Sequence, residues 1–189
     1  AGERDFVSGT YPDFKYESIA FYAMSGSSTG TSPVFRFFNP QSGAHFYTIS
    51  ATERDFVRTT YPVFQFEGNS WWAQTTAGGG NTAMYRFYNS KTGAHFYTGS
   101  AAERDFVIRT LPDFKYESVA FYAMSGQATG VSPVFRFYNP DSGAHFYTIS
   151  EAERDYVRST LVNFQYNGPS WWAQAAGGNG TAAVYRFYN

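Results

Sequence analysis

Cysteine is absent from the 189 residues, which excludes a disulfide framework and thiol-based catalysis. Long apolar runs are missing as well. None approaches the roughly 20 residues that a membrane-spanning helix needs, so we expect no membrane insertion. Neither charge is in excess, because 14 Lys and Arg residues face 15 Asp and Glu residues, for a net charge of −1. Without a basic stripe for a phosphate backbone, nucleic acid is not an expected partner.

Aromatic side chains, in contrast, are abundant. The chain contains 20 Phe, 16 Tyr and 4 Trp residues, together 21% of its length. The core of a small repeat protein uses some of these rings, but packing alone does not require so many. Tyr and Trp combine an apolar face with a polar edge, which suits half-hydrated ligand surfaces. The composition therefore points to aromatic binding surfaces.

The tripeptide Glu-Arg-Asp occurs four times with a step of fifty residues, at 3–5, 53–55, 103–105 and 153–155. A period of this size is typical of one supersecondary unit that is stacked or arranged in a ring. We therefore read residues 1–189 as a single repeat domain. Its segments are 1–33 (a partial unit), 34–83, 84–133, 134–183 and 184–189. Such an architecture favours a surface presented several times over one catalytic cleft.

The units also alternate between two kinds. Residues 20–26 and 120–126 both read Ala-Phe-Tyr-Ala-Met-Ser-Gly, whereas residues 70–74 and 170–174 both read Ser-Trp-Trp-Ala-Gln. This pattern is that of a unit that was doubled, diverged and was doubled again. It predicts two kinds of potential site, each present twice.

The strands of one unit can be read from residues 34–83. Residues 34–39 are β-branched and aromatic, which predicts a strand. A turn sequence at 40–43 leads to a second strand at 44–48, so the two should form a hairpin. A third extended stretch begins at residue 64.

A short helix is predicted between the second and third strands. Ser50 and Glu53 match a capping box, in which the Ser hydroxyl and the Glu carboxylate bind the first free amides of a helix. Phe56, Val57 and Tyr61 are expected to form its apolar face, and a proline ends it.

The predicted fold is mainly β with short helices, in four units of strand, turn, strand, helix and strand. We expect a closed or nearly closed, propeller-like ring, with a stacked solenoid as the alternative. Residues 184–189, which end at Asn189, repeat the first strand of a unit and would complete the first unit. The strand equivalent to 45–48 has no fourth copy. Closure would then be imperfect, or a second chain could fill the gap in a homodimer.

Residues 85–123 contain Tyr-Arg-Phe-Tyr-Asn, Thr-Gly-Ala-His-Phe-Tyr-Thr, Ala-Glu-Arg-Asp and Phe-Lys-Tyr-Glu, and this run resembles a module of unknown function. That module occurs in many secreted bacterial and some fungal proteins, often beside cell-wall or polysaccharide hydrolases. The resemblance covers essentially the whole chain. It implies a glycan-binding accessory role and a secreted or cell-surface location rather than a cytoplasmic one. The positions that match are Arg86, Asn89, His95, Tyr97, Tyr116 and Glu117.

The chain departs from the module's Glu-Gly dipeptide in three units. It reads Glu-Ser at 17–18 and 117–118, and Asn-Gly at 167–168. Asn167 removes the carboxylate from one unit, so a chemistry that needs this Glu in every unit is not expected.

The tryptophans are the first candidates for ligand binding, because indole rings stack on the C–H faces of sugars. Asn and Gln side chains beside them can bind vicinal hydroxyls. The candidate residues are Trp71, Trp72, Asn69 and Gln74 in one unit, and Trp171, Trp172 and Gln174 in another. Neighbouring side chains on a strand point to opposite faces. Either one Trp of each pair is core and the other exposed, or both serve packing.

The Glu-Arg-Asp triplet permits the hypothesis of a hydrolase, since two carboxylates can serve glycoside hydrolysis. A purely structural role for the triplet is favoured, because Glu53 already has a role in the capping box. Arg54 or Arg36 would then tie one unit to the next by charge-assisted bonds. An enzyme would also rarely keep four near-identical centres.

His45, His95 and His145 lie on three separate hairpins, with no cysteine and no His-x-x-x-His spacing nearby. A metal site is therefore not expected. The favoured interpretation is a hairpin histidine bonded to a backbone carbonyl. A hydroxyl-binding role together with Asn39, Asn89 or Asn139 is the alternative.

The sequence thus predicts a non-enzymatic, multivalent carbohydrate-binding protein, a lectin or wall-binding module, with no cofactor. Weak contacts to a polymeric or clustered glycan would add up through avidity. A protein-interaction, inhibitor or scaffold module is the second hypothesis. A glycan hydrolase that uses a Glu/Asp pair is the third.

Overall fold

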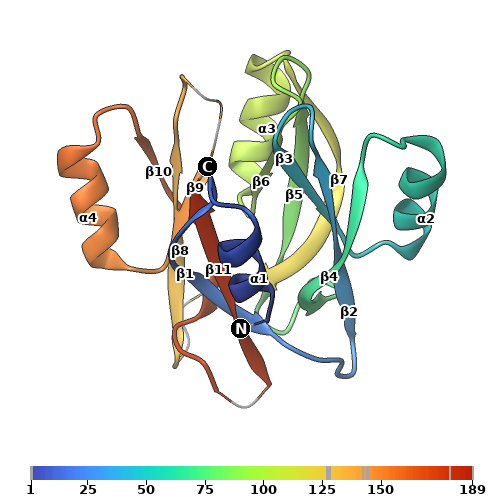
Figure 1. Cartoon of the computed structure of the whole chain (residues 1–189), viewed down its shortest axis with the longest axis horizontal. Helices are drawn as coiled ribbons and strands as arrows, with labels where there is room; N and C mark the ends of the chain where they lie inside the picture. The colour runs from blue at the N-terminus through green and yellow to red at the C-terminus, as the bar shows by residue number, and fades with distance from the viewer. Residues whose placement is uncertain (1, 127–128, 142, 144, 179, 189) are drawn as a thin grey trace.

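The computed structural model describes residues 2–126, 129–141, 143, 145–178 and 180–188, and shows a mainly β protein with short helices (Figure 1). Four inner strands form its centre: β1 (Lys15–Met24), β4 (Gln65–Gln74), β7 (Phe114–Met124) and β10 (Gln165–Gln174). Each pairs with two others of the set, through Met24 with Trp72, Gln74 with Tyr122, Met124 with Trp172, and Gln174 with Tyr22. The predicted ring is therefore confirmed as a closed one, and the stacked solenoid is not the fold.

Each of three units adds a hairpin and a helix to its inner strand. The hairpins are β2 (Thr31–Asn39) with β3 (Ala44–Thr48), β5 (Asn81–Asn89) with β6 (His95–Thr98), and β8 (Val131–Tyr138) with β9 (His145–Thr148). The helices are α2 (Ala51–Thr60), α3 (Ala101–Thr110) and α4 (Glu151–Thr160). The first strand of each hairpin also pairs with the inner strand of its unit. The order of elements is the predicted strand, strand, helix and strand.

The two ends of the chain form the fourth sheet. β11 (Thr181–Tyr188) pairs with β1 from Lys15 opposite Tyr188 to Met24 opposite Thr181, and the two strands lie side by side in Figure 1. α1 (Gly2–Thr10) precedes β1 in this unit. The last predicted strand thus completes the first unit, although its final residue, Asn189, lies outside the described residues.

The core of the ring explains the alternation of units. Phe21 packs edge-on against Trp71 and Trp171, with ring centroids 6.0 and 5.6 Å apart. Phe121 in turn lies 5.8 Å from Trp71. Two Phe and two Trp residues thus alternate around the central cluster, where small residues such as Ala73 fill the remaining space. The alternation is a packing feature, since each large indole has phenyl neighbours.

Backbone hydrogen bonds tie neighbouring units together. The amide of Ile49 donates to the carbonyl of Ala120 at 3.0 Å, and the amide of Ile149 donates to the carbonyl of Ala20 at 3.1 Å. Ala20 and Ala120 lie where the strand register shifts, so the extra residue of a bulge leaves its carbonyl free for the next unit.

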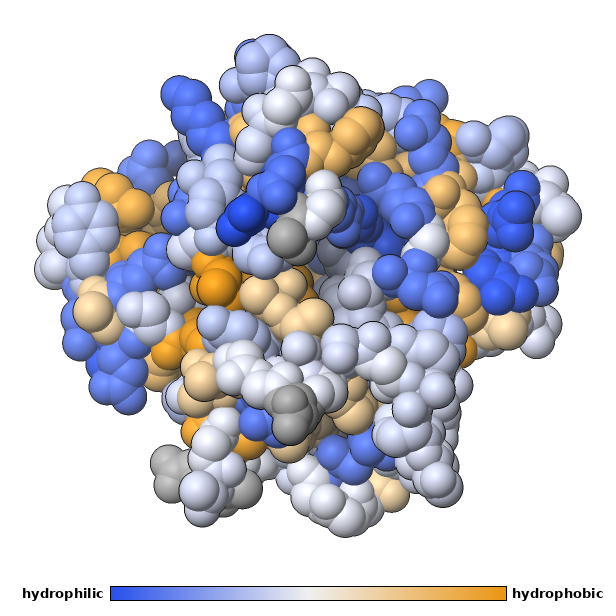
Figure 2. Space-filling model, turned by 60° about the horizontal axis from the view of Figure 1, so that its bottom comes forward, coloured by the Kyte–Doolittle hydropathy of each residue, from blue (hydrophilic) through white to orange (hydrophobic). Residues whose placement is uncertain are grey.

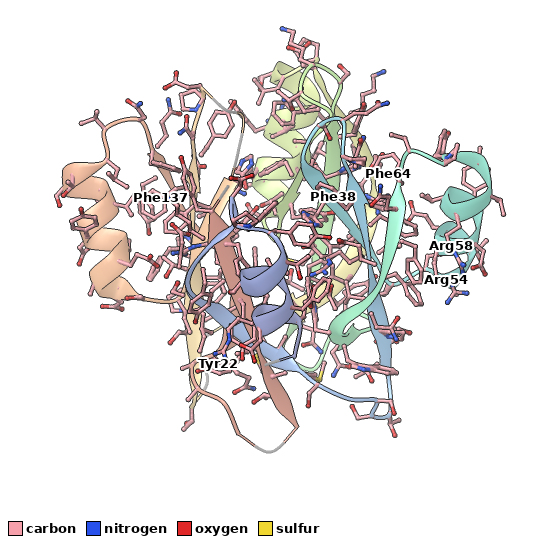
Figure 3. The ribbon with its side chains drawn as sticks, in the orientation of Figure 1. Tyr22, Phe38, Arg54, Arg58, Phe64 and Phe137 are labelled. Atoms are coloured by element: carbon pink, nitrogen blue, oxygen red, sulfur yellow. The ribbon has the colours of Figure 1, made fainter. Side chains whose placement is uncertain are left out.

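Helices α2, α3 and α4 each bury one valine, Val57, Val107 and Val157. Val57 of α2 packs against Phe37, and Val157 of α4 packs against Phe137, which Figure 3 shows between the helix and its sheet. The prediction of a broader apolar face was wrong, because Phe56 and Tyr61 are 53% and 48% exposed. None of the described helices combines the length and hydropathy needed to cross a membrane.

Candidate functional site

A buried arginine marks the boundary between two units. The Nε atom of Arg86 donates to Glu117 at 2.6 Å, and Nη2 donates to Glu53 at 2.6 Å. Its Nη1 donates to the backbone oxygen of Tyr47 at 3.0 Å, and the guanidinium lies 4.5 Å from the centre of the Phe46 ring. Burial opposes the charge, but the hydrogen bond to Glu53 and the field of both carboxylates raise the pKa of Arg86, which therefore stays protonated.

The two carboxylates reach this arginine from different elements. Glu53 lies in the first turn of α2, where Ser50 caps the helix by accepting a hydrogen bond from the Glu53 amide at 3.1 Å. Glu117 is the extra residue of a bulge between Tyr116 and Ser118 in β7. A bulge re-aims its side chain, which here meets Arg86.

The capping box is therefore only half formed. Ser50 is the cap, as predicted, but the carboxylate of Glu53 binds Arg86 of the next unit instead of the Ser50 amide. That amide donates to the hydroxyl of Thr48 at 3.0 Å. A buried guanidinium holds a carboxylate more strongly than a neutral amide does, which explains the exchange of partners.

A cavity of about 230 Å³ opens above this network. It is lined by Phe46, Glu53, Phe56, Val57, Tyr61, Phe64, Arg86, His95 and Glu117. Its volume is below the ~300–1,000 Å³ of pockets for drug-sized ligands, so it suits one ring of a larger ligand. Phe56 and Tyr61 form a half-exposed wall, with centroids 5.8 Å apart and planes at 83°. Phe64 lies deeper in the same cavity and is labelled in Figure 3. We call this cavity and its lining residues the Arg86 boundary site.

The cavity combines aromatic walls with hydrogen-bonding groups of both kinds. The side chains of Glu53 and Glu117 are 30% and 32% exposed, so both are partly open to solvent. Burial alone would raise the pKa of Glu117, but the hydrogen bond from His95 and the charge of Arg86 outweigh it and lower the pKa. Ionised carboxylates accept hydrogen bonds, so hydroxyl groups are suitable ligands.

The arrangement recurs at the other unit boundaries. The ion pairs are Arg36 with Glu3 and Glu67, Arg136 with Glu103, and Arg186 with Glu153 and Glu17. The residues that correspond to Phe56 are exposed as well: Phe6 is 59%, Phe106 52% and Tyr156 59% exposed. The predicted tie between units is thus made by the Arg36 series.

The arginine of the Glu-Arg-Asp triplet stays within its own unit. Arg54 pairs with Asp55 at 2.8 Å and stacks on Phe35 at 4.6 Å, and Figure 3 shows it on α2 beside Arg58. The hydrogen bond from Arg54 lowers the pKa of Asp55. Both carboxylates of the triplet are therefore held by arginines, and they have different partners.

Two of the three candidate histidines face carboxylates. The Nε2 atom of His45 lies 3.2 Å from Glu67, and that of His95 lies 3.4 Å from Glu117, where the sequence predicted backbone carbonyls. His145 is paired with no carboxylate of the described residues, and Asn167 occupies the position that matches Glu117. Burial first, and then the charge of Arg136, lower the pKa of His145 to about 3. Among the residues that the structure describes, no group of three or more His, Cys, Asp or Glu side chains could hold a metal ion.

The candidate tryptophans divide as strand alternation requires. Trp171 is 8% exposed, and Trp71 packs against the same central cluster. Trp72 and Trp172 are half-buried on the other side of their strands, opposite Pro33 and Pro133. The indole nitrogen of Trp172 is buried, with no hydrogen-bond partner in the described part of the chain. Any ligand contact of these pairs thus belongs to the second Trp.

The polar residues beside them lie apart from the Arg86 boundary site. Asn69 is exposed opposite Phe35, and Gln74 and Gln174 are half-buried. The side-chain nitrogen of Gln174 lies 3.9 Å from the sulfur of Met124.

The candidate asparagines shape the hairpin turns. The side-chain oxygen of Asn39 accepts from the Gln41 amide at 3.0 Å, and that of Asn89 accepts from the Lys91 amide at 2.9 Å. Asn139 accepts from the amide of Asp141 at 2.9 Å. Each asparagine therefore bridges its own turn.

Phe56 and Tyr61 were not predicted as cavity residues, because their spacing also suits a buried helix face. Arg86, His95 and Glu117 were matched to the module, but their contact with one another was not predicted. Their shared repeat positions indicate this contact, since each boundary needs one helix Glu and one strand Arg.

Comparison with known proteins identifies the family of this chain. No curated protein and no solved structure matches this chain. A domain family of unknown function, DUF5648, matches residues 1–124 and again residues 83–189, in two overlapping segments as expected for repeats. Together the two segments span the whole chain, which belongs to the DUF5648 family.

Proposed function

We propose that the protein binds carbohydrate without catalysis, as a lectin or wall-binding module, through the sites at its unit boundaries. The observation that carries this proposal is the Arg86 boundary site. There an aromatic wall, Phe56 and Tyr61, stands beside the carboxylates of Glu53 and Glu117. Sugar rings present flat C–H faces to aromatic rings and hydroxyl donors to carboxylates, so this pair of features suits a pyranose.

Repetition supports the same proposal. The exposed aromatic residue and the helix glutamate recur at every unit, at Phe6, Phe56, Phe106 and Tyr156. Such sites point outward around a ring and can engage several branches of one glycan. Avidity over weak sites can raise the apparent affinity by roughly 10²–10⁴. On the face in Figure 2, apolar residues lie in separate patches between hydrophilic ones, as separate small sites require.

A protein-interaction module is the second candidate, and exposed aliphatic residues favour it. Ile108 is 51% and Val162 91% exposed, and neither lines the Arg86 boundary site. Aliphatic side chains lack the flat face that a sugar stacks on, but they suit a protein surface. The two candidates therefore differ in the residues that they use.

A glycan array that includes peptidoglycan and chitin fragments tests the proposal. The variant Phe6→Ala/Phe56→Ala/Phe106→Ala/Tyr156→Ala removes the exposed aromatic residue of every unit and should keep the fold, since all four residues are more than half exposed. We expect it to lose array binding, and Phe56→Ala alone to weaken binding to a multivalent glycan about tenfold, or 1.4 kcal/mol.

The matched control is Ile108→Ala, on the same helix as Phe106 but without an aromatic ring. It should leave glycan binding intact and reduce any capture of a protein partner. If only Trp72→Ala/Trp172→Ala loses glycan binding, the binding site lies on the inner strands and its assignment to the unit boundaries is refuted. If the natural chain binds none of the glycans on the array, the proposed function is refuted. Release of reducing ends from a bound glycan would instead establish a hydrolase.

A further inference from the structure

At the boundary around Arg136, one donor atom of the arginine lacks the partner that it has at the other boundaries. Its Nη1 atom donates to the backbone oxygen of Tyr97 at 3.1 Å, its Nη2 binds Glu103, and its guanidinium stacks on Phe96 at 4.7 Å. The Nε atom, however, is buried without any hydrogen-bond partner among the described residues. Arg136 is 2% exposed, so this is an unsatisfied donor inside the protein. We call Glu103, Arg136, His145 and Asn167 the Arg136 boundary site.

The other units show what belongs at this Nε atom. A carboxylate oxygen lies 2.6 Å from Nε of Arg86, 2.7 Å from that of Arg36 and 2.6 Å from that of Arg186. In each case it comes from the bulge residue of the inner strand: Glu117, Glu67 and Glu17. In the Arg136 unit the bulge residue is Asn167. A buried donor of a charged group that is left unpaired destabilises the protein, so an oxygen acceptor at this place is favoured.

The missing oxygen has a second donor beside it. In the Arg86 unit, the Glu117 oxygen that binds Arg86 also lies 3.4 Å from Nε2 of His95. His145 follows His95 by fifty residues and pairs with Tyr138 as His95 pairs with Tyr88. An oxygen at the matching place would therefore meet both Arg136 and His145. The way in is from solvent, because the equivalent glutamate side chains are 29–39% exposed and Asn167 is exposed.

The charge of the site points to the kind of oxygen. In the described part of the chain, each of the other boundaries pairs two carboxylates with one arginine, whereas Arg136 is paired with Glu103 alone. One further negative charge would restore the balance of the other units. A carboxylate supplied by a ligand does so and fits the donor geometry of an arginine.

We propose that the Arg136 boundary site binds the carboxylate of an acidic sugar, with one oxygen on Nε of Arg136 and on His145. The ring of the sugar would lie against Phe106, which is 52% exposed on the neighbouring helix. This inference rests on the proposed function, because it assumes that the unit-boundary sites bind sugars. It assigns acidic sugars to the Arg136 boundary site, so the protein would bind neutral and acidic residues of the same glycan at different boundaries.

Glucuronate and galacturonate are the probes, with glucose, galactose and acetate as comparators. Titration of the natural chain, followed by the Nε–H resonance of Arg136 in NMR, should show a shift with either uronate. Asn167→Glu copies the other three units and fills the place with the protein's own carboxylate. We expect it to weaken uronate binding at least tenfold and leave neutral-glycan binding unchanged. Glu117→Asn should create a second uronate site, now reported by Arg86.

The outcomes separate the two proposals. Neutral glycans that bind while no uronate shifts Arg136 would overturn this inference and leave the proposed function standing. Uronate binding that Asn167→Glu does not change would overturn it as well. Acetate that binds as tightly as glucuronate would refute the sugar assignment. Should neither neutral nor acidic sugars bind, both proposals fail. If Asn167→Glu does not fold, the gain expected in Glu117→Asn decides the matter alone.

Discussion

The Arg86 and Arg136 boundaries hold their arginines through the same kinds of contact, except at the bulge residue. Both arginines donate to a backbone oxygen, at 3.0 and 3.1 Å, and both stack on a Phe ring, at 4.5 and 4.7 Å. Both also bind the glutamate of the preceding helix. Among these arginine contacts the bulge residue differs, Glu117 against Asn167, and Tyr61 of the cavity wall is replaced by Leu111. The backbone oxygen, the Phe ring and the helix glutamate therefore suffice to place the arginine, and the second carboxylate can vary without loss of the fold.

The largest effect should come from removal of the arginines themselves. Arg86→Met leaves Glu53 and Glu117 close together without their shared cation, so we expect a loss of roughly 3–5 kcal/mol in the free energy of unfolding. Arg136→Met leaves only Glu103 unpaired and also removes the orphaned Nε donor, so its loss should be smaller. Urea denaturation at pH 7 compares the two. Equal losses of unfolding free energy in the two variants would show that the carboxylate of the bulge residue does not contribute to stability.

The exchange of the bulge residues should have a moderate effect. Glu117→Asn is expected to lower the free energy of unfolding by about 1–2 kcal/mol, because it removes a charge-assisted bond from a side chain that is one-third exposed. Asn167→Glu should raise it by about 1 kcal/mol, since it satisfies the Nε atom of Arg136. Thermal or urea unfolding of both variants measures the difference. A loss in both would mean that the two boundaries are not equivalent.

This exchange has a pH dependence whose sign follows from Glu117. Its pKa in the folded state is lower than the ordinary 4.5, so the folded state favours the ionised form. The stabilisation is fully present above pH 4.5 and is lost as the pH falls through the lower, folded value. The difference between Glu117→Asn and the natural chain should therefore disappear in acid. A difference that persists at low pH would show that shape, not charge, is responsible.

The ring and the helix caps could be predicted from the sequence, because both depend on local or periodic features. A fifty-residue period with hairpin signals left few architectures, and Ser50 needs only the amide three residues ahead. The partner of the Glu53 carboxylate could not be predicted in the same way. Arg86 lies 33 residues further on, in the next unit, and only tertiary packing brings the two together.

Bulges and exposure were the other limits of prediction. Strand alternation predicts that the two tryptophans of a pair lie on opposite faces, but the register shifts near Gly68 and Asn69 change which face is turned to the core. Gly68 has φ of +96°, a conformation suited to such an irregularity. Hydrophobicity likewise does not distinguish a buried Val57 from an exposed Phe56, because both fit an amphipathic helix.

The smallest effect should be a change in titration of His145. Burial and the charge of Arg136 hold its pKa at about 3, so the imidazole stays neutral from pH 5 to 8. The unfolded state binds a proton near pH 6.5, so this group makes the protein less stable as the pH falls below that value. Asn167→Glu places a carboxylate beside the ring and should raise the pKa of His145, as an opposite charge favours the protonated form. Imidazole Cε1–H shifts in NMR measure both values. An unchanged pKa would show that a carboxylate at residue 167 does not reach His145 as Glu117 reaches His95.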